Sequence, residues 1–164
     1  MIKKGKELAK QLKGKKVVVV TGQLCNEIEF GSKKLLDYAV EISNKLNAPV
    51  AAAGNTPLPL KEKGVKTVHK MWAIELMNNM RYPWEKDKEH PIIADQKPDV
   101  LVLIGYTGPI AQTLVSTVKK ENGKTVVLGS TYVEGATYSF PNSTSFKQWE
   151  QNLKELVDSL EGVK

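Results

Sequence analysis

The residues best placed to do chemistry are those of the segment Gly105-Tyr106-Thr107-Gly108-Pro109. An apolar run precedes this segment, and a helical pattern follows it. Free backbone N–H groups at the start of a helix bind anions, and the helix dipole assists them. A plain strand-to-helix turn uses the same residues. The segment by itself therefore leaves open whether it holds a nucleotide or only turns the chain.

Three other apolar runs also end in a glycine, at Gly22-Gln23, Gly54-Asn55 and Gly129-Ser130. The carboxyl ends of parallel strands meet at one edge of a sheet, where ligands of α/β proteins bind. The turn TGQLCNEIEFG lacks the GxGxxG fingerprint, and the chain has no Walker A motif. Nucleotide binding at this edge stays an open alternative. Its candidate residues, acting through backbone N–H groups and small side chains, are Gly22, Gln23, Gly54, Asn55, Gly105, Thr107 and Gly108.

The single cysteine, Cys25, follows a predicted strand, where nucleophiles often lie. No histidine or acid can be paired with it from the sequence, which favours a structural thiol. Glu27 could act as an acid or base, although a solvated loop is the simpler interpretation. His69 and His90 lack the spacing of metal ligands, so no metal site is predicted.

Large apolar side chains are concentrated in MWAIELMNNMRYPW, at residues 71–84. They cover more than one face of a helix, whereas one buried face needs fewer. Methionine and aromatic residues are enriched at protein interfaces, so an interface is favoured over a thick core helix. The predicted interface residues are Met71, Trp72, Met77, Met80, Tyr82 and Trp84.

Helices and buried strands alternate along the chain, which predicts an α/β fold with a mainly parallel sheet and helices on both faces. The β-branched runs and turns predict strands at residues 17–20, 49–53, 100–104 and 125–128, with a short fifth strand at 138–140. Helices are expected at residues 2–13, 33–46 (with Ser32 as its N-cap), 67–80, from Pro109, and after a capping box at Ser145 and Gln148. Ile110, Leu114 and Val118 are predicted to share one helix face, and Phe146, Trp149, Leu153, Leu156 and Leu160 are predicted to form a buried stripe.

The 164 residues suit a single domain spanning 1–164. The net charge of +6 comes almost entirely from lysine, because Arg81 is the only arginine. Lysines spread along the chain favour a solvated surface over a nucleic-acid interface. The chain shows neither a transmembrane run nor an apolar signal segment, and one cysteine excludes an internal disulfide. We therefore expect a cytoplasmic protein that does not associate with membranes.

Three stretches together resemble one known family: GKKVVVVTGQL, KPDVLVLIGYTG and GATYSFPNSTSFKQWEQNL. They look like the epsilon subunit of the archaeal acetyl-CoA decarbonylase/synthase complex, the small partner of its carbon monoxide dehydrogenase. The resemblance covers nearly the whole chain. Its most specific part runs from Ala136 to Asn142 and leads into the helix of Trp149.

The resemblance implies a three-layer αβα Rossmann-like domain of the deoxyhypusine-synthase-like, NAD/FAD-binding type. It also implies a non-catalytic subunit that binds the large metal-cluster (alpha) subunit in an α2ε2 unit, stabilises that unit and assists electron transfer to FAD. FAD is thus the candidate cofactor, and no catalytic residue can be carried over. Two alternatives stay open: a free-standing enzyme acting on a nucleotide or phosphorylated metabolite through Cys25 or Glu27, and a nucleic-acid binder.

Overall fold

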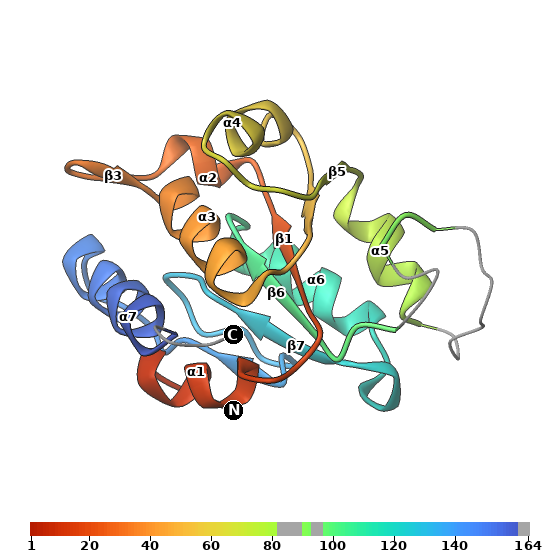
Figure 1. Cartoon of the computed structure of the whole chain (residues 1–164). Helices are drawn as coiled ribbons and strands as arrows, with labels where there is room; N and C mark the ends of the chain where they lie inside the picture. Colours follow the sequence, from red (N-terminus) through yellow and green to blue (C-terminus); the bar gives the residue numbers. More distant parts are fainter. Residues whose placement is uncertain (82–89, 93–96, 161–164) are drawn as a thin grey trace.

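A six-stranded parallel sheet forms the centre of the computed structural model, which describes residues 1–81, 90–92 and 97–160 (Figure 1). Its order is β5-β4-β1-β6-β7-β8, and every neighbouring pair is parallel. The strands are β1 (Val17–Thr21), β4 (Val50–Ala52), β5 (Val68–Lys70), β6 (Val100–Ile104), β7 (Lys124–Val127) and β8 (Tyr138–Ser139). The chain runs outward from β1 to β5, returns to β6 beside β1, and then continues to the opposite edge. The prediction of a three-layer, mainly parallel α/β fold is confirmed.

Helices cover both faces of this sheet (Figure 1). One face packs against α1 (Gly5–Leu12), α3 (Leu35–Leu46) and α7 (Phe146–Ser159). The other packs against α5 (Ala73–Asn79) and α6 (Gly108–Thr117). Along β1, Val17 and Val19 enter the first core cluster, while Val18 and Val20 enter the second. Burial on both faces explains why the predicted strand is a continuous apolar run rather than an alternating one.

Short elements occupy the connections between these layers. They are α2 (Leu24–Glu27), the antiparallel hairpin of β2 (Glu29–Phe30) and β3 (Lys33–Lys34), α4 (Pro57–Glu62) and the 3₁₀ turn Lys120–Asn122. Within the described ranges, no helix combines the length and the apolar character that crossing a bilayer requires.

The prediction of one helix over residues 67–80 is wrong in its first part. Val68–Lys70 is strand β5, in which His69 pairs with Ala51 of β4, and the helix begins only at Ala73. The sequence is ambiguous here because the strand has only three residues and its side chains are not fully buried. Pairing with β4, about 18 residues earlier in the chain, decides the outcome.

The predicted amino end of the helix over residues 33–46 is also wrong, since Ser32 lies in the turn between β2 and β3 and Lys34 is the N-cap. The Asp37 carboxylate there accepts a hydrogen bond from the Lys34 backbone N–H at 2.8 Å. At the last helix Ser145 is the N-cap as predicted, since its hydroxyl accepts from the Gln148 N–H at 3.2 Å, but the Gln148 side chain accepts from the Thr144 N–H at 2.7 Å rather than from Ser145. The predicted fifth strand is present as β8.

Two residues of the predicted helix faces lie at the surface, and for Phe146 this contradicts the predicted burial. Ile110 is 52% exposed and Phe146 is 53% exposed, whereas Leu114 and Trp149 on the same stripes are buried. Both exposed residues stand in the first turn of their helices, α6 and α7. A helix that begins at the sheet edge has its first turn beyond the sheet. Residues of that turn are therefore exposed even where they share a face with buried residues of the later turns.

Candidate functional site

A cleft lies at the carboxyl edge of the sheet, where β4, β1 and β6 end. It consists of one cavity of about 390 Å³ and a second of about 380 Å³, which share Ala53, Gly54, Tyr106 and Ile110 in their walls. We call the two together the carboxyl-edge cleft. It lies where the strand order reverses between β1 and β6, the usual ligand position in open α/β sheets.

Five of the seven predicted binding residues line the first cavity, namely Gly22, Gln23, Gly54, Gly105 and Thr107. The other two are not in the wall of either cavity. Asn55 instead accepts two hydrogen bonds from the Asn26 side-chain amide, both at 2.9 Å. Gly108 packs against Thr131, whose hydroxyl would meet any Cβ added there. Five of the predicted residues thus lie in the wall of a cavity at the predicted edge, and ligand binding there stays a prediction.

The glycines at the ends of β1 and β6 are explained by contact between the two turns. A Cβ at Gly22 would collide with the backbone oxygen of Gly105 and with the Tyr106 ring. A Cβ at Gly105 would meet the Cys25 sulfur and the oxygen of Gly22, and Gly105 also has a φ of +92°. These two glycines allow one turn to approach the other.

The backbone amides of the first turn are already used within the protein. Gly22 donates to Ile104 at 2.9 Å, Leu24 donates to Gly105 at 3.1 Å, and Cys25 donates to Gly22 at 3.1 Å. The Asn26 amide donates to Gln23 at 3.2 Å. A helix of only four residues follows, so its dipole is small. Four amides of this turn, those of Gly22, Leu24, Cys25 and Asn26, are therefore engaged within the protein.

Tyr106 covers this turn from the side of the cleft. Its hydroxyl donates to the backbone oxygen of Thr21 at 3.0 Å, and its ring lies against Gly22. Burial raises the pKa of the Tyr106 phenol, so the hydroxyl remains a proton donor at physiological pH. The sequence contained Tyr106 within the glycine segment but carried no signal of this role, which depends on the distant residue Thr21.

These residues do not fit the pyrophosphate of FAD or another dinucleotide bound in the usual way. The close backbone approach that a glycine normally offers to phosphate is taken by Tyr106. The Glu27 carboxylate also lines the first cavity and would repel phosphate. Gly22 and Gly105 therefore allow the turns after β1 and β6 to pack against each other.

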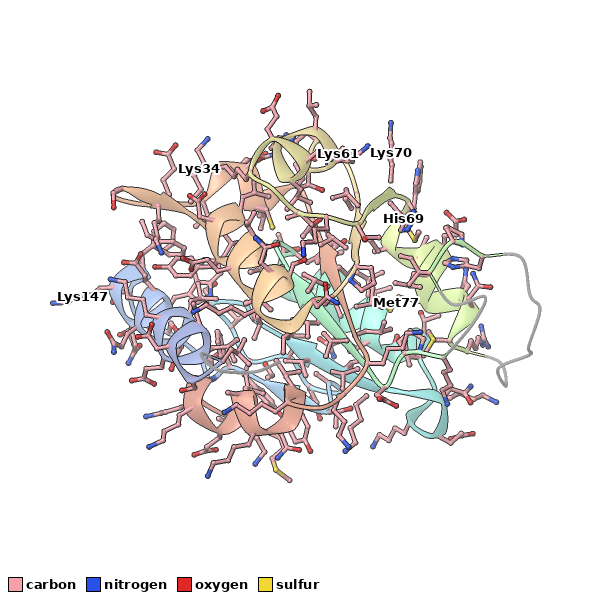
Figure 2. The ribbon with its side chains drawn as sticks, viewed as in Figure 1. Lys34, Lys61, His69, Lys70, Met77 and Lys147 are labelled. Carbon is pink, nitrogen blue, oxygen red and sulfur yellow. The ribbon has the colours of Figure 1, made fainter. Side chains whose placement is uncertain are left out.

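The second cavity has mainly apolar walls and is bordered by Trp72, Ile74 and Ile110. Trp72 is 76% exposed and Ile74 is 39% exposed. Three of the other predicted interface residues, Met71, Met77 and Met80, are buried in the core cluster under α5 and α6; Tyr82 and Trp84 lie outside the described residues. Figure 2 shows Met77 directed into the protein and Lys70 pointing away from it. Trp72 is therefore the described member of that set that a partner could touch.

The candidate reactive side chains are not arranged for catalysis. Cys25 is fully buried and its thiol donates to the oxygen of Ile104 at 3.3 Å. Burial raises the pKa of this thiol to about 12, so it stays protonated and weakly nucleophilic. Glu27 accepts from the Gln23 side chain at 3.0 Å. Within the part of the chain that the structure describes, no three His, Cys, Asp or Glu residues are grouped to hold a metal ion.

The sequence matches one protein family along almost all of its length. The model of that family, described as CO dehydrogenase beta subunit/acetyl-CoA synthase epsilon subunit, aligns with residues 1–157. The aligned region contains the sheet, the carboxyl-edge cleft and nearly all of α7.

Individual relatives agree with this match. The chain is 24% identical over 161 residues to the acetyl-CoA decarbonylase/synthase complex subunit epsilon 1 of Archaeoglobus fulgidus, covering 96% of this chain and 83% of that protein. It is 28% identical to subunit epsilon 1 of Methanosarcina barkeri, covering 94% and 86% of the two chains. The chain is 27% identical to subunit epsilon 2 of Methanosarcina mazei, again covering 94% of this chain and 86% of that protein.

One solved structure also aligns with the chain, the CurF ER cyclopropanase from the curacin A biosynthetic pathway. The TM-score is 0.48 at 15% identity, and the alignment covers 95% of this chain but only 44% of the other. The chain thus spans less than half the length of that structure.

Proposed function

The chain belongs to the family of CO dehydrogenase beta subunits and acetyl-CoA synthase epsilon subunits, and from this premise we propose that it is the epsilon subunit of an acetyl-CoA decarbonylase/synthase complex. In this role it is one accessory domain, residues 1–164, that binds the large metal-cluster (alpha) subunit of carbon monoxide dehydrogenase. It stabilises that component in an α2ε2 unit, while the redox chemistry takes place in the partner.

The observation that carries this proposal is the family match over residues 1–157. The surface beside the carboxyl-edge cleft adds a physical reason. An indole that is 76% exposed and stands beside two exposed isoleucines, Ile74 and Ile110, leaves apolar area in contact with water. Tryptophan is enriched among the residues that dominate binding energy at interfaces. Contact with a partner subunit would remove this area from water.

The buried thiol argues against the alternative of a free-standing enzyme. A nucleophilic cysteine needs a lowered pKa and access for the substrate, and Cys25 has neither. Glu27 lies at the cleft, but its described side-chain partner is an amide rather than a second acid or base. No described arrangement supports catalysis by the chain alone.

The family resemblance also implies a role in electron transfer to FAD. The cleft lies at the right edge of the sheet for a flavin nucleotide. However, four of the first-turn amides are engaged within the protein, Tyr106 covers Gly22, and Glu27 lines the cavity. These contacts do not support a pyrophosphate site, and we restrict the proposal to the structural role.

The test is co-expression of the chain with the alpha subunit encoded by the same organism. We expect a stoichiometric complex on size exclusion, in which the alpha subunit resists heat inactivation better than it does alone. The isolated chain should show no oxidation of CO with any electron acceptor. Flavin retained by the purified complex or chain is read from visible absorbance after denaturation.

Failure of the chain to co-purify with the alpha subunit, under salt conditions from low to physiological, would overturn the proposal. Turnover of a substrate by the isolated chain would do the same. Stoichiometric flavin bound to the isolated chain would contradict the restriction to a structural role.

A further inference from the structure

Two further cavities lie at the amino edge of the sheet, opposite the carboxyl-edge cleft. One of about 470 Å³ lies beside the starts of β1, β4 and β5, and contains Lys16, Lys66 and His69 in its wall. The other, of about 310 Å³, lies beside the starts of β6 and β7. Its wall contains Lys15, Lys97, Lys120 and Lys124. The two cavities adjoin at the neighbouring residues Lys15 and Lys16.

These six lysines form what we call the amino-edge lysine row. Lys16 immediately precedes β1, Lys66 precedes β5, Lys97 precedes β6, and Lys124 begins β7. From β5 to β7 the sheet contains five adjacent strands. With a spacing of about 4.8 Å between strands, the row spans roughly 19 Å. The fold thus collects on one edge lysines that are scattered along the sequence between positions 15 and 124.

The charge at this edge is unbalanced. The two cavities contain six lysines, two in one and four in the other, against the acids Asp99 and Glu121. The Asp99 carboxylate accepts a hydrogen bond from the Lys16 backbone N–H at 2.9 Å, and Lys97 donates to the backbone oxygen of Glu121 at 3.2 Å. The carboxyl-edge cleft, by comparison, has one lysine, Lys70, and one acid, Glu27. Among the described wall residues, lysines therefore outnumber acids at the amino edge and not at the carboxyl-edge cleft.

Helix dipoles explain only part of this pattern. Helix carboxyl ends lie at this edge and favour cations within the last turn. Lys66 comes four residues after the end of α4 at Glu62, and Lys97 precedes β6 rather than following a described helix. The strand starts therefore determine where these two lysines lie; Lys66 is exposed, and Lys97 is half-buried and hydrogen-bonded to Glu121.

We propose that the amino-edge lysine row is a docking surface for an acidic protein surface of the complex, presented by the alpha subunit. This inference rests on the proposed function. A row of roughly 19 Å is too long for one small anion, and charge complementarity of this kind accelerates and orients association between proteins. Among the residues that the structure describes, the cavity walls contain no arginine, phenylalanine, tyrosine or tryptophan, the residues that read or stack on nucleic-acid bases. Trp72 lies at the carboxyl edge of the sheet and the lysine row at the amino edge. The chain would therefore present one apolar and one basic contact surface to the proposed complex.

Charge reversal at three exposed positions tests this surface: Lys15→Glu, Lys66→Glu and Lys120→Glu combined in one variant. The matched control reverses three lysines that line neither cavity, the exposed Lys6 and Lys147 and the half-exposed Lys34; Figure 2 shows Lys34 and Lys147 on the left of the molecule. Both variants change the net charge equally. Thermal melts confirm that each folds, and binding to the purified alpha subunit is measured from low to physiological salt.

We expect the edge variant to bind at least about tenfold more weakly at low salt, mainly through slower association, and to show a flatter salt dependence. The control variant should stay within about twofold of the unmodified chain. Equal weakening of both variants, or of neither, would reject the docking surface. A variant that binds the alpha subunit normally but loses binding to a duplex or single-stranded oligonucleotide would instead assign the row to nucleic acid. If the unmodified chain fails to bind, the proposed function itself falls.

Discussion

The hydroxyl of Tyr106 donates to the backbone oxygen of Thr21 at 3.0 Å, and the same oxygen accepts from the Ala53 amide at 3.1 Å. One carbonyl at the end of β1 therefore connects the turns that follow β4 and β6. This connection lies at the point where the strand order reverses, the place at which nucleotides enter related architectures. In this chain, Tyr106 and the two packed turns form part of the wall of the carboxyl-edge cleft at that point.

Replacing Tyr106 tests the connection. Tyr106→Phe removes one hydrogen bond but leaves the Thr21 oxygen paired with Ala53, so we expect a loss of about 0.5–1 kcal/mol in the free energy of unfolding. Tyr106→Ala also removes the ring over Gly22 and should cost about 2 kcal/mol or more. Urea unfolding measures both. Equal costs for the two variants would show that the ring contributes nothing.

Gly22→Ala should be more damaging than Gly31→Ala. A Cβ at Gly22 collides with the backbone of Gly105, which cannot move aside cheaply, and we expect a cost of about 3 kcal/mol. Gly31 has a φ of +75° but open space around it, so alanine there should cost about 1 kcal/mol of backbone strain. The midpoints of urea unfolding compare the two variants. The reverse order would mean that the turns do not pack as described.

Trp72→Ala should weaken binding to the alpha subunit by about 2 kcal/mol, roughly thirtyfold, because exposed tryptophans often anchor interfaces. The free energy of unfolding should change by less than about 0.5 kcal/mol, since the side chain is mostly in water. Isothermal titration calorimetry measures the first effect, and thermal melts measure the second. Leu58→Ala is the control, because Leu58 is 65% exposed and lines neither cavity of the cleft. Unchanged affinity in Trp72→Ala would remove this residue from the interface.

Cys25 should make stability fall at high pH. The pKa of its thiol rises from 9.0 to about 12 on folding, so the folded chain holds a proton that the unfolded chain releases between these values. The proton-linked stability is complete below pH 9 and is lost as the pH rises toward 12, by at most about 1.4 kcal/mol per unit. Lysine and tyrosine also titrate there, so the measured quantity is the difference from Cys25→Ala.

The alanine variant should lack this part of the decline. Parallel pH profiles of the two proteins would contradict the burial of the thiol. A second readout needs no extreme pH: the native chain should resist alkylation by iodoacetamide, while the unfolded chain should react quickly.

Much of the fold was predictable because its signals are local. The β-branched run Val17–Val20, Pro109 at the start of α6 and the Ser145 cap each act within a few residues. Strand β5 was missed because three residues carry too little periodicity, and only pairing with β4 makes them a strand. Met77 and Trp72 could not be separated by composition, since one lies under α5 and α6 and the other in solvent.

The sequence by itself determined the alternation of strands and helices, the glycine-ended edge and the family resemblance, because these depend on neighbours along the chain. Tertiary structure alone decided that Gly22 and Gly105 allow two turns to pack closely and that the Tyr106 hydroxyl bonds to Thr21. It also decided that lysines from distant segments form one row. The physical reason is that each of these relationships joins residues far apart in sequence. Parallel strand pairing brings such residues together only when the whole sheet has formed.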